Sequence, residues 1–241
     1  PPARLPDSAQ PASDEPLPAG TGWRLWQGLS LAGLLLTLAT GFLGSRNPYS
    51  NFGMTWFWIV FLLGTTYLTA LIGAGNARAN PWHVMVQAVA GMSRIWRDGI
   101  WRYPVWLGYW PALLAFMALI WIELFVHAMP FSLATLLLGY SLYTLLASAI
   151  FGAADWLRHG ELFSVFLRLI ALMSCRRDGR WQLPFSTLLS ARCESYSLLV
   201  FLLFMLSATS FDGLHESAPW VRLFWTDVMV LLRPWLTPPL I

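Results

Sequence analysis

Charged side chains are scarce in this chain, and lysine is absent altogether. Only 11% of the 241 residues are charged, and all 15 basic residues are arginines. A soluble domain normally carries about 25% charged residues, so too little polar surface remains here to face water. With 57% hydrophobic residues and a mean hydropathy of +0.56, the composition predicts a protein covered by lipid. Fifteen tryptophans support this, because aromatic rings collect at the headgroup level of bilayers.

Motifs of several protein classes are also missing. The two cysteines, Cys175 and Cys193, form neither a CxxC pair nor a zinc-like spacing, and we interpret them as ordinary thiols. The chain has no P-loop, no GxGxxG and no GxSxG. Its arginines lie in loops beside apolar segments rather than in a stripe on a polar domain, so no nucleic-acid binding is expected. Membrane orientation and contacts with lipid headgroups account for them better.

The first 22 residues are rich in Pro, Ala, Ser and Asp and show no apolar period. They predict a disordered tail or linker ahead of a transmembrane helical domain over residues 23–241. The chain begins at Pro1 without a methionine and stops at Ile241 directly after a Pro-Pro pair. We therefore expect a longer protein at both ends.

Long apolar segments recur along the chain, and about 20 such residues cross a bilayer as a helix. The predicted fold class is all-α, a polytopic transmembrane helical bundle of about six spans. The expected spans cover about residues 23–43, 52–74, 109–128, 131–151, 196–211 and 220–236. The last is marginal because it contains Arg222, Asp227 and Arg233.

Two further stretches are expected to lie on the membrane surface as amphipathic helices. Residues 81–97 have apolar positions at helical spacing and two arginines near the end. The apolar part of residues 153–174 is short and contains Arg168, and an arginine at mid-bilayer costs about 2.5 kcal/mol or more. We therefore predict one or two interfacial helices here. If residues 153–174 crossed the bilayer, the topology would invert locally.

The arginines also predict an orientation. Residues 75–108 and 153–195 together hold ten of them, whereas residues 44–51 hold one. Because cytoplasmic loops carry an excess of positive charge, both long loops and the N-terminal tail are expected in the cytoplasm. Residues 44–51 and 212–219 then face outward.

Glu123 is the only acid in the apolar stretch FMALIWIELFV. Ionisable groups inside spans usually face the bundle interior and mark a functional path. His127 follows one turn later on the same helical face, so the pair could bind a metal or relay protons. The alternatives are a structural hydrogen bond or a solvated position near the outer interface.

The sequence FDGLHES, expected as an outer loop, contains Asp212 and His215 three positions apart. These residues could share a metal or act as a base and the group that orients it, although Asp-Gly is also a plain turn signal. In the six-span arrangement this loop and His127 lie on one side. A joint site of Glu123, His127, Asp212 and His215 is therefore permitted.

Two other polar clusters are more typical of helix ends than of a metal or catalytic site. In DWLRHGE, Asp155 and His159 lie one helical turn apart and Glu161 follows, but the HExxH spacing of a zinc helix is missing. We favour a solvated, capped helix start over a metal half-site. Asn-Pro turns at Asn47 and Asn80 start new elements, and their amides could cap helices or line a pore.

Taken in order, NPYSNF, NPW, WPALLAFMALIWIELF, DWLRHGELFSVF and TSFDG resemble the bacterial fenitrothion hydrolase family. The resemblance covers about Gly20 to Trp220. It implies a polytopic protein of the bacterial inner membrane that hydrolyses organophosphate triesters. Water would attack phosphorus and a stabilised phenolate would leave, which needs a general base or a metal-bound hydroxide.

On this chain the resemblance implies Asp212 and His215 as base or metal ligands, His127 as a further metal ligand and Glu123 as an orienting group. The implied cofactor is a divalent metal, and the expected partners are membrane lipids and other membrane subunits. A non-catalytic subunit of a larger complex remains an alternative, because catalytic residues are few and small residues able to pack helices are many. A transporter is less favoured, because we see neither an inverted repeat nor a span broken at mid-bilayer.

Overall fold

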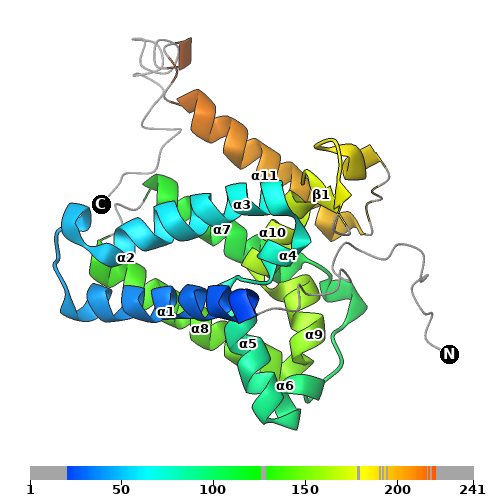
Figure 1. Ribbon diagram of the computed structural model, residues 1–241, viewed down its shortest axis with the longest axis horizontal. Helices are drawn as coiled ribbons and strands as arrows, with labels where there is room; N and C mark the ends of the chain where they lie inside the picture. The colour runs from blue at the N-terminus through cyan, green and yellow to red at the C-terminus, as the bar shows by residue number, and fades with distance from the viewer. Residues whose placement is uncertain are drawn as a thin grey trace, which may run out of the picture. The chain divides into compact units, whose positions relative to one another are not determined.

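The computed structural model of the 241-residue chain describes residues 21–125, 129–177, 180–189, 191, 193, 195–215, 217 and 219–220. The chain divides into two compact units, Pro1–Ser197 and Leu198–Ile241. The first unit contains every element except most of one helix (Figure 1).

Within the described residues the chain is an all-α helical bundle, with strand limited to two residue pairs. Five helical stretches among these residues are long and apolar enough to cross a membrane, as in an integral membrane protein. They are α1 (Thr21–Leu43), the continuous run of α2 (Phe52–Thr55), η3 (Trp56–Gly64) and α3 (Thr65–Ile72), then α7 (Trp110–Phe125), α8 (Pro130–Phe151) and α11 (Tyr196–His215). They lie where five of the six spans were predicted. The sixth, 220–236, lies outside the described residues beyond Trp220.

The shorter elements connect these helices. They are η2 (Pro48–Ser50), α4 (Ala74–Ala77), α5 (Pro81–Met92), α6 (Arg94–Asp98), η4 (Val105–Leu107), α9 (Ala153–Asp155), η5 (Trp156–Gly160), α10 (Leu162–Ala171), β1 (Arg176–Arg177), β2 (Arg180–Trp181) and η6 (Ser186–Leu189). Strands β1 and β2 pair antiparallel.

The outer faces of the long helices are apolar. Leu36 in α1 is 50% exposed, Ile59 in η3 58% and Leu146 in α8 64%. Such side chains would be costly to leave in water over so wide a surface, whereas lipid solvates them without cost. The exposed surface therefore agrees with the composition.

Contacts at the two ends of α1 fix the directions of its neighbours. Near the start of α1, the indole N–H of Trp26 donates to Asn76 Oδ1, just after α3 (3.1 Å). At the other end, a Cβ added to Gly41 would collide with Ala134 and lie 2.9 Å from the carbonyl oxygen of Pro130 in α8. The start of α1 and the ends of α3 and α8 therefore lie at one end of the first unit, which we call the basic end.

Both long arginine-bearing segments begin and return at the basic end. Residues 75–108 connect α3 to α7, and residues 153–195 connect α8 to α11. The N–H of Tyr109, just before α7, donates to Ser197 Oγ near the start of α11 (3.0 Å). The two segments thus share one side, as predicted, and the assignment of that side to the cytoplasm remains a prediction.

Each segment first turns back into the bundle. Helix α4 folds back along α3, where the Asn76 amide donates to Thr69 Oγ1 (2.9 Å). Helix α5 then starts beside the middle of α8, where the indole N–H of Trp82 donates to Ser141 Oγ (3.0 Å). In the second segment, α9 and η5 enter beside α5, and α10 returns along α3 and α4.

The first turns of α5 and α10 are therefore not on the surface, where the sequence placed these helices. Trp82 and Val86 in α5, like Phe163 and Val165 in α10, are almost fully buried. Burial is tolerated because each helix start carries its own cap, which satisfies N–H groups of the first turn. Since each segment returns to the end where it began, the topology is not inverted.

In the second unit, α11 continues through Asp212 and Gly213 to His215. The prediction of a turn at Asp212-Gly213 is therefore wrong, because these residues lie in the last turn of α11. One glycine costs a helix only about 1 kcal/mol, which a long apolar helix can absorb.

Candidate functional site

Glu161 is fully buried at the turn between η5 and α10. Its Oε1 accepts hydrogen bonds from the Tyr140 hydroxyl (2.6 Å) and the Phe163 N–H (3.1 Å). Its Oε2 accepts from the Ser164 N–H (2.6 Å) and from Nδ2 of Asn80 (2.8 Å). Four donors around two oxygens match an ionised carboxylate, which only accepts hydrogen bonds. We call Glu161, Tyr140 and Asn80 the buried carboxylate centre.

This centre satisfies most of the N–H groups at the start of α10. A helix leaves its first four N–H groups without internal partners. Phe163 and Ser164 donate to the Glu161 carboxylate, as described above, and the Glu161 N–H donates to the Trp156 carbonyl (2.9 Å). The remaining group, the Leu162 N–H, donates to the Tyr140 hydroxyl (3.1 Å). A capped helix start was predicted at this position, but the cap is buried rather than solvated.

Asn80 joins this centre to a second helix start. Its Oδ1 accepts from the Trp82 N–H (3.1 Å) and so caps α5, which has Pro81 in its first turn. Its Nδ2 donates to Glu161, as given above. Asn80 is itself fully buried. One amide therefore caps α5 with its oxygen and holds the cap of α10 with its nitrogen.

Two helix N-termini thus converge on one carboxylate. Each carries the equivalent of about half a positive charge, so together they offset the charge of Glu161. Tyr140 lies half-way along the 22-residue helix α8, which puts Glu161 well inside the bundle. In transporters, helix starts at such a depth bind anionic substrates, whereas here a carboxylate of the chain itself fills the position.

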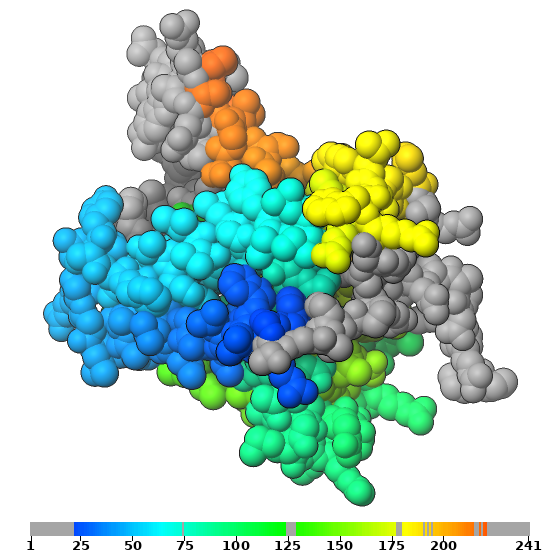
Figure 2. All heavy atoms as spheres, in the orientation of Figure 1, coloured from blue at the N-terminus to red at the C-terminus, as the bar shows by residue number. Residues whose placement is uncertain are grey.

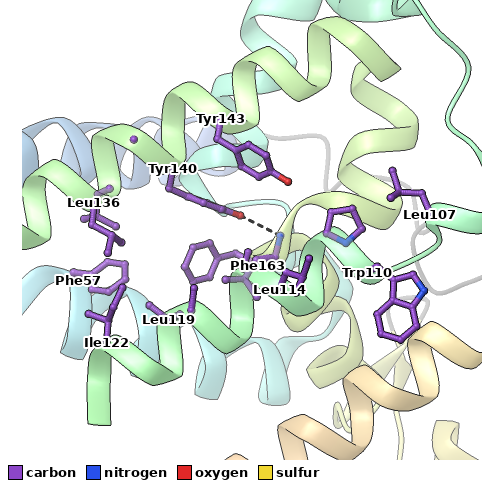
Figure 3. A pocket seen from close by; sticks show the side chains of 16 residues that line it. Phe57, Leu107, Trp110, Leu114, Leu119, Ile122, Leu136, Tyr140, Tyr143 and Phe163 are labelled. Atoms are coloured by element: carbon purple, nitrogen blue, oxygen red, sulfur yellow. Dashed lines mark hydrogen bonds between the residues drawn. The ribbon is translucent and has the colours of Figure 1, made fainter. Parts of the chain in front are cut away.

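A cavity of about 560 Å³ lies next to this centre, between α7 and α8 (Figure 3). Its walls include Leu114, Leu119 and Ile122 from α7, with Phe57 and Phe163 closing it on the inner side. Almost all of the lining is apolar. The two hydroxyl-bearing side chains in the wall are Tyr140 and Tyr143 of α8.

Two cavity residues also hold the helix starts together. The Tyr140 ring lines the cavity while its hydroxyl bonds to α10, as the dashed line in Figure 3 marks. The Phe163 ring lines the cavity and stacks on Trp82 of α5, with centroids 4.6 Å apart. A ligand in the cavity would therefore touch the side chains that pin α5 and α10.

A second aromatic cluster lies at the basic end. The His159 ring stacks on Tyr103 with centroids 5.4 Å apart and is tilted against Tyr109 at 5.2 Å. The guanidinium of Arg168 lies over the Tyr109 ring, 5.7 Å from its centroid. His159 Nδ1 lies 3.2 Å from the backbone oxygen of Asp155.

Burial shifts the pKa of three groups in the two arginine-bearing segments, residues 75–108 and 153–195. Burial lowers the pKa of His159, and the nearby Arg168 and Arg158 lower it further. Burial lowers the pKa of His83 to about 4, with a smaller contribution from the charge of Arg78. Burial raises the pKa of Tyr103 well above its usual value. Both histidines are therefore neutral at physiological pH.

The residues predicted to form a joint outer site are divided between the two units and a stretch outside the described residues. Glu123 lies exposed near the end of α7 in the first unit, and His127 lies outside the described residues. Asp212 and His215 belong to α11 in the second unit. Their catalytic and metal-binding roles therefore stay predictions. Among the described residues, no three His, Cys, Asp or Glu side chains lie close enough to hold a metal.

The asparagine turns act as helix caps. Asn47 Oδ1 accepts from the Tyr49 N–H (3.0 Å), and Asn51 Oδ1 accepts from the Gly53 N–H (2.8 Å). The Asn51 amide also donates to the Thr40 carbonyl (2.8 Å), which ties the turn to α1. Capping was one of the two roles predicted for these side chains.

A scan against protein-family models, a search of curated proteins and a search of solved structures found no match to this chain.

Proposed function

We propose that this chain is an integral membrane protein that takes a lipid-soluble aromatic molecule from the bilayer into the cavity between α7 and α8. The cavity supports this proposal: its volume of about 560 Å³ falls within the range of roughly 300–1,000 Å³ common for ligand sites. Leu114, Ala118 and Gly139 line it and are exposed. The cavity therefore opens sideways between two apolar helices, where an apolar ligand arrives directly from lipid.

Hydrolysis of an aromatic organophosphate triester is the reaction we propose for this site, on the basis of the resemblance to fenitrothion hydrolases. In this proposal Tyr143, which lines the cavity, donates its hydroxyl to a phosphoryl oxygen. The base would come from Asp212 and His215, with His127 as a further ligand of a divalent metal and Glu123 as the orienting group. Triester hydrolysis needs a base and an electrophilic group at the phosphoryl oxygen.

The proposed location is the bacterial inner membrane, with the basic end in the cytoplasm. The excess of arginine in the segments at that end supports this orientation. It is tested by attaching a cysteine-reactive, membrane-impermeant label to Cys193, which is exposed. Labelling in inverted vesicles but not in intact cells is the expected result, and the reverse pattern would overturn the orientation.

The cavity can be filled without disturbing the backbone. A Cβ added at Gly139 meets no atom within 4 Å, and Gly139 lines the cavity. Gly139→Phe should therefore block it. Gly28→Phe is the matched control, because Gly28 is equally open and lies on the exposed face of α1.

The test uses purified full-length protein in lipid nanodiscs and a nitrophenyl phosphotriester. Binding is measured by equilibrium partition of the radiolabelled triester, and hydrolysis by the absorbance of released nitrophenolate. Wild type and Gly28→Phe should bind the triester, and Gly139→Phe should not. Equal binding by all three proteins, or no binding above empty nanodiscs, would refute the proposed site.

A non-catalytic membrane subunit is the second candidate. The observation that favours it is the state of Glu161, the acid next to the cavity, whose two oxygens are already filled by four donors. A carboxylate held in this way supports helix packing better than proton transfer. Triester binding without hydrolysis, together with stoichiometric co-purification of other subunits, would favour this candidate over the hydrolase.

A further inference from the structure

We propose that residues 94–106, which we call the collar, form a binding surface for the headgroups of anionic phospholipids at the basic end. The collar comprises α6, the start of η4 and the linker between them. It is separate from the cavity, so the proposal does not depend on the proposed function.

The backbone of the collar is fixed against the end of α8. The N–H groups of Ile100 and Trp101 both donate to the carbonyl of Ile150, at 2.9 and 2.7 Å. The indole N–H of Trp96 donates to the carbonyl of Leu145 (3.0 Å). Because α8 is long enough to cross the hydrocarbon layer, a segment tied to its last turn lies at the level of the headgroups.

Large apolar side chains of the collar point outward. Ile100 is 67% exposed, Trp101 70%, Val105 74% and Trp106 78%. Two tryptophans in this state are costly in water but favourable at a membrane interface, where the ring rests among acyl chains and headgroups. In Figure 2 the side chains around residue 100 form the green lower edge of the view.

Positive charge lies among these apolar side chains. Arg94, Arg97 and Arg102 are all exposed, and the one acid of the collar, Asp98, lies 3.6 Å from Arg97. Exposed Arg158 adds a further positive charge in η5. An excess of guanidinium beside interfacial tryptophans is complementary to the phosphates of an anionic leaflet, which guanidinium groups bind through two hydrogen bonds.

The experiment uses the full chain in a neutral detergent supplemented with phosphatidylglycerol or phosphatidylcholine at equal mole fraction. We expect phosphatidylglycerol to raise the thermal unfolding midpoint more than phosphatidylcholine, by at least about 2 °C, because a ligand that binds the folded state stabilises it. The difference should shrink in about 1 M salt, which screens charge. Replacing Arg94, Arg97 and Arg102 together with glutamine should remove most of it.

Two control variants separate headgroup binding from other effects. Replacing the same three arginines with lysine keeps the charge and should keep most of the difference, and Arg46→Gln at the opposite end should keep all of it. Equal shifts with both lipids, or an unchanged difference in the glutamine variant, would overturn the proposal. So would equal stabilisation of wild type by soluble polyglutamate, which would point to an acidic protein partner instead of a lipid surface.

Discussion

The Tyr140 hydroxyl donates a hydrogen bond of 2.6 Å to Oε1 of Glu161, and the ring that carries it forms part of the cavity wall. The same hydroxyl accepts from the Leu162 N–H (3.1 Å). One side chain therefore connects the cavity to the buried start of α10. A ligand that moved the ring would disturb both hydrogen bonds, so occupancy of the cavity would change the stability of α10.

Tyr140→Phe should weaken the first turn of α10. The variant keeps the ring but leaves the Leu162 N–H unpaired and removes one donor from Glu161, a loss of about 1–3 kcal/mol for a buried group. We expect faster amide hydrogen exchange in a peptide that covers residues 162–171. Tyr67→Phe is the control, because Tyr67 is 69% exposed on α3. Unchanged exchange in Tyr140→Phe would show that the hydroxyl does not support the helix.

Asn80 and Glu161 should behave as a coupled pair. Glu161→Gln places an NH₂ group where only acceptors fit, and Asn80→Ala removes the cap of α5 together with one donor to Oε2. Each change should lower the free energy of unfolding by about 1–3 kcal/mol. The double variant should lose less than the sum, with a coupling energy of about 0.5–3 kcal/mol.

The measurement is chemical unfolding in detergent for wild type, both single variants and the double variant. Gly28→Ala combined with Glu161→Gln is the control, because Gly28 is exposed on α1 and meets no atom within 4 Å of an added Cβ. That pair should be additive within about 0.5 kcal/mol. An additive Asn80 and Glu161 pair would mean that the 2.8 Å contact does not hold α5 to α10.

Spans could be predicted from the sequence because their signal is local. A run of apolar residues long enough to cross a membrane is visible without knowing any partner, and α8 begins at Pro130 and ends before Gly152, as turn residues indicate. The caps at Asn80 and Glu161 are equally local, since each residue bonds to N–H groups two or three positions later.

The meeting of the two caps could not be predicted. Asn80 and Glu161 are separated by 81 positions, and nothing in either stretch specifies the other. Arg168 also suggested a surface helix, because a charged group is costly at mid-bilayer. In the structure its guanidinium donates to the Arg158 carbonyl (2.7 Å) and lies over the Tyr109 ring near the basic end. The apolar part of α10 is therefore buried in the bundle, while the charged group of Arg168 lies near the basic end.

Gly41 should set the spacing of α1 and α8. A Cβ at this position would collide with Ala134 and lie 2.9 Å from the Pro130 carbonyl oxygen, so even a small side chain must push the helices apart. Gly41→Leu should lower the unfolding free energy by about 1–3 kcal/mol through overpacking. Gly28→Leu, at an open position of the same helix, should have little effect. Similar midpoints for the two variants in thermal unfolding would refute the close contact.

His159 should make the protein less stable in acid. Its pKa is lowered in the folded protein by burial and by Arg168 and Arg158, whereas in the unfolded chain it stays near 6.5. The unfolded state therefore binds more protons below about pH 6.5. The contribution of His159 to stability is complete above that pH and is lost as the pH falls toward the lower, folded pKa.

His159→Gln removes this titration, because glutamine stays neutral at every pH. The measurement is the unfolding midpoint in detergent at pH 7.5, 6.5 and 5.5 for wild type and variant. We expect the midpoint of wild type to fall more steeply than that of the variant, since protonation of carboxylates elsewhere affects both proteins equally. Parallel lines for the two proteins would mean that His159 is as easily protonated in the folded protein as in the unfolded chain, and that its packing against Tyr103 and Tyr109 does not exclude the charged ring.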